Sequence, residues 1–131
     1  MAADRRPVAQ FRVYRTSRGV IVWRLVASNN RVLGVSATGF PAVQDAITAI
    51  RTVRDGTSTA SIEVLHVPDR DWTWRMHGGE GTVIAVSYRS YKRRIDCRRA
   101  TERFAAAAPY AEVDPAVGRR GRFWSADQGV D

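Results

Sequence analysis

The residues best suited to chemistry are basic side chains clustered between residues 88 and 103. Seven basic residues lie there against two acidic ones, which leaves a formal charge of seven minus two, or +5. On a helix of ordinary geometry, one face carries Lys92, Arg99 and Arg103, with Arg94 and Arg98 beside them. Guanidinium groups bind phosphate in a bidentate manner, so these five residues, the arginine ridge, predict a surface that follows a phosphate backbone. The alternative is a solvated helix face whose charge maintains solubility.

A second basic group lies in the C-terminal tail, residues 115–131. The tail lacks hydrophobic periodicity, so we expect it to be disordered, and we expect residues 1–9 to be flexible. Arginines beside aromatic residues can stack on bases or dock on a partner, and the candidates are Arg119, Arg120, Arg122 and Trp124. A passive tail is the alternative, because these three arginines are balanced by Asp114, Asp127 and Asp131.

Residues that serve in catalysis or metal binding are few. His66 and His77 fall about 13 Å apart along a predicted hairpin, so they cannot share a proton or a metal ion. Cys97 lies on the apolar face of a predicted helix, where cysteine behaves as a small hydrophobic residue. The sequence contains no nucleophile elbow, no phosphate-binding glycine motif and no zinc spacing of cysteine and histidine. We therefore expect neither catalysis nor a cofactor nor a metal site.

The overall composition limits the class of protein. The net charge of +8 comes almost wholly from arginine, a bias that a GC-rich genome also produces, and Lys92 is the only lysine. A single cysteine excludes an intrachain disulfide and suits a reducing compartment. The sequence shows no secretory signal and no apolar run long enough to span a bilayer. We expect a cytoplasmic protein without membrane attachment.

An internal repeat supplies the elements that position these residues. When the chain is shifted by 51 residues it overlays itself without a gap, so that Trp23-Arg24-Leu25 falls on Trp74-Arg75-Met76 and Phe40 falls on Tyr91. Repeats of this length indicate that one supersecondary unit is used more than once. Two copies are too few for a solenoid, so we predict one pseudo-twofold domain.

Each copy reads as three strands, a helix and a further strand. In the first copy these are Gln10–Arg15, Val20–Ala27, Arg31–Ser36, the helix Pro41–Arg54 and Thr59–Ile62. In the second copy they are a hairpin of residues 62–67 and 72–77, a turn at Gly79-Glu80-Gly81, the helix Lys92–Ala107 and the strand Tyr110–Val113. Asn30 and Gly81 stand at equivalent turn positions, and both residue types tolerate positive φ.

Strand alternation separates the residues of the repeated Trp-Arg motif. Trp23 and Trp74 are expected to face the helices and the core, while Arg24 and Arg75 point to the opposite face. The outer sheet face therefore consists of Val22, Arg24, Val26, Thr73, Arg75 and His77. Its valines make it a candidate surface for pairing with another chain.

The motifs of the two copies resemble the YegP-like family, small bacterial and archaeal domains of unknown function. The resemblance rests on the W-R-L/M strand, the turn before V-L/I-G/A-V-S, and the aromatic residue that leads into a D-A or D-C helix. It covers residues 10–61 as the first repeat and 62–114 as the second. It implies an α+β fold of two β3-α-β units, with one antiparallel sheet, exchanged C-terminal strands and both helices packed on one face. The family carries no agreed catalytic residues, so the resemblance assigns no site.

These patterns predict a small non-catalytic binding or interaction module that works as a monomer or a homodimer, with another protein as its partner. The alternative is a sequence-tolerant nucleic-acid-binding protein that uses the arginine ridge and the C-terminal tail.

Overall fold

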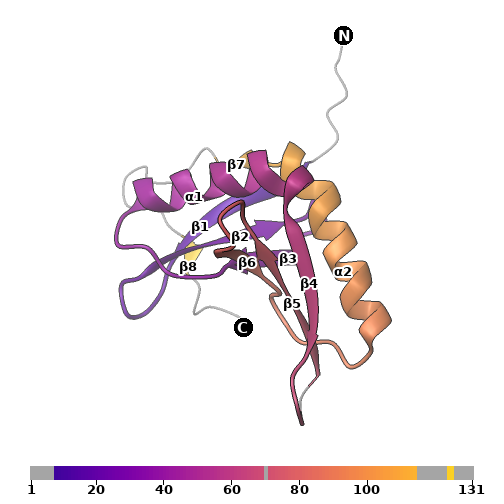
Figure 1. Cartoon of the computed structure of the whole chain (residues 1–131). Helices are drawn as coiled ribbons and strands as arrows, with labels where there is room; N and C mark the ends of the chain where they lie inside the picture. Colours follow the sequence, from indigo (N-terminus) through magenta and orange to yellow (C-terminus); the bar gives the residue numbers. More distant parts are fainter. Residues whose placement is uncertain (1–7, 70, 115–123, 126–131) are drawn as a thin grey trace.

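The strand segments of the sequence form one sheet, covered on one face by two helices. The computed structural model describes residues 8–69, 71–114 and 124–125 (Figure 1). The strands are β1 (Gln10–Arg15), β2 (Ile21–Val26), β3 (Val32–Ser36), β4 (Ser61–His66), β5 (Trp72–His77), β6 (Val83–Val86), β7 (Glu112–Val113) and β8 (Trp124–Ser125). The helices are α1 (Val43–Gly56) and α2 (Arg94–Ala107), followed by the 3-10 turns η1 (Thr57–Thr59) and η2 (Ala108–Tyr110).

The predicted strands β1, β2 and β3 agree with the structure to within one residue at each end, whereas both helices begin two residues later than predicted. Ala42 and Arg93, which precede the helices, have extended backbones. Lys92 therefore lies outside α2. The strands predicted directly after the helices are also displaced, because η1 and η2 occupy those positions. The predicted strand 59–62 is replaced by the start of β4, and of the predicted strand 110–113 only the last two residues form β7.

The sheet has the order β4-β5-β6-β3-β2-β1-β7, and β8 also pairs with β1. The exchange of a C-terminal strand is confirmed, since β7 of the second copy pairs with β1 of the first. The expectation of a fully antiparallel sheet is wrong, because β7 and β8 run parallel to β1. Nearly the whole chain lies between β1 and β7, so no tight hairpin forces these two strands to be antiparallel. Within the tail, Trp124–Ser125 forms β8, so these two residues depart from the expected disorder.

The 51-residue spacing recurs in the hydrogen bonds of the structure. The Trp23 amide donates to Ser36 Oγ at 3.2 Å, and the Trp74 amide donates to Ser87 Oγ at 3.3 Å. The two tight turns also correspond, with φ of 72° at Asn30 and 82° at Gly81. Residue positions 51 apart can therefore be compared as occupants of the same place in the two halves.

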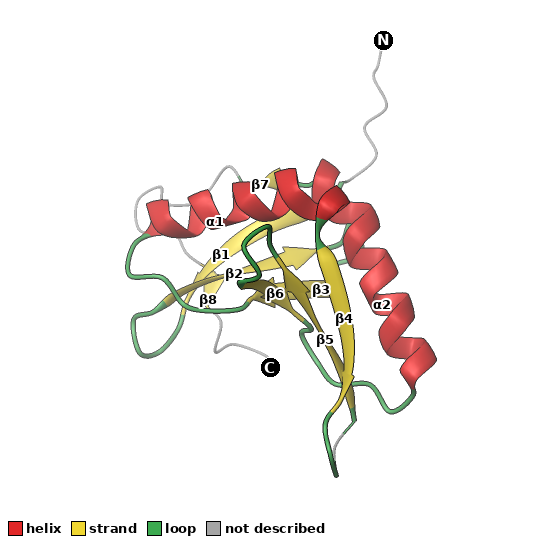
Figure 2. Ribbon diagram, in the orientation of Figure 1, coloured by secondary structure: helices red, strands yellow, loops and turns green. Residues whose placement is uncertain are grey.

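The core lies between the sheet and the helices (Figure 2). The predicted inward residues are buried, with exposures of 0–1% at Trp23, Leu25, Trp74 and Met76. Helix α1 packs on β1 and β2, and α2 packs on β3, β4 and β5. Among the described residues, neither helix is long and apolar enough to cross a membrane.

Candidate anion-binding pocket

The arginine ridge does not form one continuous surface. Arg94 turns toward the sheet, where its Cζ lies 5.9 Å from the centre of the Trp72 ring. Arg98 and Arg99 are exposed on α2, and Lys92 is exposed in the loop before it. Arg103, near the end of the helix, lines a pocket. The helical-wheel prediction is therefore wrong for Lys92, which lies outside the helix, whereas Arg99 and Arg103 lie on the same side of α2 as expected.

The other candidate residues are placed apart from α2. The Cζ of Arg24 lies 4.6 Å from the ring centre of Tyr14 and 5.4 Å from that of Tyr88, both within cation–π range. The Nε of Arg75 donates to Glu63 Oε1 at 3.0 Å. Trp124 contributes its backbone to β8. Arg119, Arg120 and Arg122, with the side chain of Trp124, lie outside the described residues.

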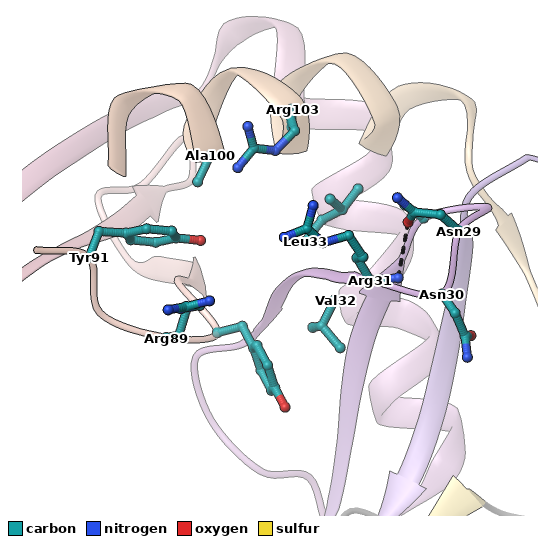
Figure 3. A pocket seen from close by; sticks show the side chains of 11 residues that line it. Asn29, Asn30, Arg31, Val32, Leu33, Arg89, Tyr91, Ala100 and Arg103 are labelled. Atoms are coloured by element: carbon teal, nitrogen blue, oxygen red, sulfur yellow. Dashed lines mark hydrogen bonds between the residues drawn. The ribbon is translucent and has the colours of Figure 1, made fainter. Parts of the chain in front are cut away.

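A pocket of about 370 Å³ opens between the β2–β3 turn, the β6–α2 loop and α2 (Figure 3). Three arginines converge on it, namely Arg31 from the turn, Arg89 from the loop and Arg103 from the helix. We call it the basic pocket. Its other lining residues are Ala27, Asn29, Asn30, Val32, Leu33, Tyr88, Tyr91 and Ala100. No aspartate or glutamate is among these described lining residues, so the three positive charges face no acidic side chain within the pocket.

Local hydrogen bonds fix the turn that presents Arg31. The Ala27 amide donates to the Arg31 carbonyl at 2.8 Å and closes the turn. Asn30 adopts the positive φ that this turn requires, and the Arg31 amide donates to Asn29 Oδ1 at 3.1 Å. The backbone from which the Arg31 side chain extends is therefore held before any ligand binds.

The opposite wall is set by a backbone bridge to the sheet. Tyr91 and Trp72 exchange two backbone hydrogen bonds, of 2.6 and 2.7 Å, which anchor the loop that precedes α2. The Cζ of Arg89 lies 5.5 Å from the ring centre of Tyr91. In Figure 3, Arg103 and Arg89 lie above and below Tyr91, while Arg31 approaches from the turn opposite. Side chains from three separate segments thus surround one space.

Two opposing influences act on the Tyr91 hydroxyl. Burial raises its pKa, and the nearby charges of Arg103, Arg89 and Arg31 lower it to a smaller extent. The hydroxyl therefore stays protonated at neutral pH and is available as a hydrogen-bond donor. The basic pocket consequently offers guanidinium and phenol donors together, a combination suited to an oxyanion.

The fold does not require the pocket's arginines. The positions 51 residues away from Arg31, Arg89 and Arg103 are occupied by Thr82, Thr38 and Thr52. The same backbone framework is therefore built in the other half with three neutral residues. Sequence reasoning missed Arg31 and Tyr91 and counted Arg89 only as bulk charge. A comparison of the two copies for changes of charge includes the three arginines but does not single them out, because pairs such as Ile47 and Arg98 also differ in charge.

The residues considered for catalysis lie elsewhere and apart. His77 contacts two acceptors, Glu63 Oε1 at 3.1 Å from Nε2 and the Gly81 carbonyl at 3.2 Å from Nδ1. His66 packs on Trp72, with ring centres 4.6 Å apart. Cys97 is fully buried, and burial raises the pKa of its thiol. These three side chains are engaged in packing or in hydrogen bonds of the framework.

Comparison with known proteins identifies the fold. No family model and no curated protein sequence matches the chain. Among solved structures, the solution NMR structure of the protein of unknown function yegP from E. coli matches with a TM-score of 0.71 and 14% identity, over 85% of this chain and 95% of that one. The solution NMR structure of a UPF0339 protein from Shewanella oneidensis also matches with a TM-score of 0.71, at 12% identity, over 81% of this chain and 89% of that one.

The resemblance to YegP-like proteins, inferred from short motifs, is thus confirmed at the level of the fold. The match extends over most of each chain, so the sheet with its two helices is a shared architecture. Identities of 12% and 14% establish the fold and carry no assignment of a ligand.

Proposed function

We propose that the protein is a non-catalytic binding module that holds an anionic group, a phosphate or a carboxylate, in the basic pocket. The observation that carries this proposal is the convergence of Arg31, Arg89 and Arg103 around Tyr91, without an acidic side chain among the described lining residues. Three guanidinium groups placed together repel one another, and an anion relieves that repulsion. The arginine fork also matches the geometry of phosphate and carboxylate oxygens.

The floor of the pocket strengthens these interactions. Val32 and Leu33 are half-buried, and Ala100 is 3% exposed, so the lining is apolar behind the charged groups. A ligand seated there is partly removed from water, and charge attraction grows as the local dielectric falls. A volume of about 370 Å³ suits a small ligand or the end of a larger one.

The chemistry of the lining residues favours binding over turnover. Arginine is protonated at all physiological pH values, and the raised pKa of Tyr91 keeps its hydroxyl protonated as well. A general base is most often a histidine or a carboxylate, and neither residue type is among these described lining residues. The residues can orient and neutralise an anion, and in this proposal they do no more. We place the module in the cytoplasm, as expected from its single, buried cysteine.

The other predicted surface, the outer sheet face, has less support. Val26 is 3% exposed, so it offers little area to a protein partner. Arg75 forms a salt bridge with Glu63, and His77 contacts the same carboxylate, so both side chains already have a partner within the sheet. We therefore favour the basic pocket over the sheet as the binding site.

The proposal is tested by titrating the full chain with inorganic phosphate, pyrophosphate and citrate, using amide NMR shifts as the readout. The variant Arg31→Thr/Arg89→Thr/Arg103→Thr places at each position the residue found at its equivalent in the other half. We expect saturable binding, with shifts centred on the pocket, and a loss of about 10-fold or more in affinity in this variant.

A matched control removes the same charge from surface positions outside the pocket. The variant Arg18→Thr/Arg51→Thr/Arg54→Thr has the same net charge as the pocket variant and should keep its affinity. Circular dichroism spectra establish that both variants fold. Equal loss in the two triple variants, or no saturable binding of any anion by the native chain, would reject the pocket as the site.

A further inference from the structure

We infer that the anion held in the basic pocket is the terminal phosphate of a single-stranded nucleic acid, and that the strand leaves the pocket along α2 past Arg99. This inference rests on the proposed function and specifies its ligand. It follows from the charge that continues beyond the pocket, from the recessed position of the pocket floor and from the number of arginines that meet there.

Positive charge extends from the pocket onto the surface of α2. Arg99 lies one helical turn before Arg103, about 6 Å along the axis and on the same side of the helix. Both are exposed. The pKa of the Asp96 carboxyl is lowered chiefly by its hydrogen bond to Arg93, and the charges of Arg99 and Arg103 lower it further. An anion at Arg103 therefore has a second guanidinium beside it, outside the pocket. A chain of phosphates can use both, whereas a small anion can use only the first.

The acidic residue near this path is already paired. The Nε and Nη2 of Arg93 donate to the two carboxylate oxygens of Asp96, at 2.8 and 3.1 Å. This bidentate contact offsets the charge that would otherwise repel a phosphate next to Arg99. Glu102 is the other acidic residue of α2, and Arg99 and Arg103 together outweigh its single charge. The path along α2 is thus positive overall.

The shape of the pocket favours a flexible strand over a duplex. Asn29, Arg31 and Arg89 are exposed at the rim, while Ala100 is buried at the floor. A duplex has a persistence length of about 150 base pairs, so over a short site it behaves as a stiff rod whose phosphates stay on its outer surface. A single strand can direct its end inward.

The number of arginines favours the end of the strand over its interior. An internal phosphodiester carries one negative charge, whereas a terminal phosphate carries about −1.5 to −2 at pH 7. Three guanidinium groups therefore match the terminal group better. Arg99 has Thr48 at the equivalent position of the first helix, as the three pocket arginines have threonines.

The test titrates the full-length protein into labelled single strands of ten nucleotides and follows the fluorescence anisotropy of the label. The strands bear a 5′ phosphate, a 3′ phosphate or no terminal phosphate. A duplex of the same sequence and a poly-glutamate peptide are the comparison ligands. We expect one phosphorylated end to bind about 10-fold or more tightly than the unphosphorylated strand, as the loss of one charged contact pair implies. The preference should weaken below about pH 6, where the terminal phosphate takes up a proton.

Variants separate the pocket from the path. Arg103→Thr should abolish the preference for a phosphorylated end. Arg99→Thr should weaken strand binding several-fold, while Arg98→Thr, an equal loss of charge on a different side of α2, should have little effect. Raising the salt from about 50 to about 200 mM should weaken strand binding steeply, because counterions are released when phosphates are contacted.

Three outcomes would overturn the inference: equal affinity for phosphorylated and unphosphorylated ends, equal or tighter binding of the duplex or the peptide, or equal effects of Arg99→Thr and Arg98→Thr. Inorganic phosphate titrated in parallel distinguishes the two proposals. If phosphate still binds in the basic pocket, the anion-binding function stands and the nucleic-acid ligand is wrong. If neither phosphate nor pyrophosphate nor citrate binds, both proposals are wrong.

Discussion

Gly34 provides the sharpest test of how the two halves are packed. A Cβ added at this position in β3 would lie 2.6 Å from both Cδ2 and Cε2 of Phe104 and 3.0 Å from Cη2 of Trp74. Carbon atoms pack best at about 3.5–4.0 Å, so these contacts are far inside the repulsive range. Phe104 and Trp74 are fully buried, with ring centres 5.0 Å apart, and neither ring has room to retreat.

The expected effect of Gly34→Ala is the difference between two terms. Overpacking a core costs about 1–3 kcal/mol. The smaller flexibility of the unfolded chain returns about 0.4–1 kcal/mol, because Gly34 does not have the positive φ that would make alanine strained. We expect a net loss of about 1–2 kcal/mol in the free energy of unfolding. Gly79→Ala, whose Cβ meets no atom within 4 Å, is the control without a clash and should stabilise the fold by about 0.4–1 kcal/mol.

The other half of the molecule suggests the compensating change. The positions equivalent to Gly34 and Phe104 hold Ala85 and Val53, both buried. Phe104→Val alone should cost about 2–4 kcal/mol, somewhat less than the cost of truncating phenylalanine to alanine. In Gly34→Ala/Phe104→Val the new methyl group fills part of the space left by the ring, so the double variant should lose at least about 1 kcal/mol less than the sum.

Urea unfolding followed by tryptophan fluorescence measures all four proteins of this cycle. The slopes of the transitions should be equal, so that differences in midpoint report stability. Stability of Gly34→Ala equal to that of the native chain, or strict additivity in the double variant, would refute the argument from packing.

Three further predictions concern hydrogen bonds and burial. The hydrogen bond from His77, and after it that from Arg75, lowers the pKa of Glu63 in the folded protein. The ionised carboxylate therefore stabilises the fold at pH values above its ordinary pKa. This contribution is lost as the pH falls through the lowered pKa of the folded state. In Glu63→Gln, the urea concentration at the unfolding midpoint should therefore change less between neutral pH and about pH 3 than it does in the native chain. Ser36→Ala removes the acceptor of the Trp23 amide and should cost about 1–3 kcal/mol in urea unfolding. Cys97, buried and with a raised pKa, should react with a thiol reagent only in urea, as monitored by absorbance.

The sequence predicts the core well because strand alternation is a local property. A residue facing inward at one position determines the face of its neighbours, so Trp23 and Trp74 could be placed in the core from pattern alone. The turns at Asn30 and Gly81 were predictable for the same reason, since positive φ selects few residue types. These features depend on few neighbours in the chain.

Features that depend on distant segments were predicted less well. The parallel pairing of β7 with β1 joins residues about a hundred positions apart, and no local pattern encodes its direction. The helical wheel placed Lys92 and Arg94 in one ridge, but the extended backbone at Arg93 begins the helix later and Arg94 turns to Trp72. Periodicity describes an ideal helix and carries no information on where the helix begins.

The basic pocket belongs to this second class, because its three arginines come from three segments. The sequence contains a further signal in the way that the two copies differ. Where they differ in the core, a neighbouring residue differs to match, as Gly34 does against Phe104. At the pocket positions, threonine in one half corresponds to arginine in the other, yet no acidic side chain is among the described lining residues. A change in volume is thus compensated inside the molecule, whereas this change in charge is not. Because these three arginines also converge on one pocket, we propose that an anionic ligand supplies the compensating charge and that they form a binding site.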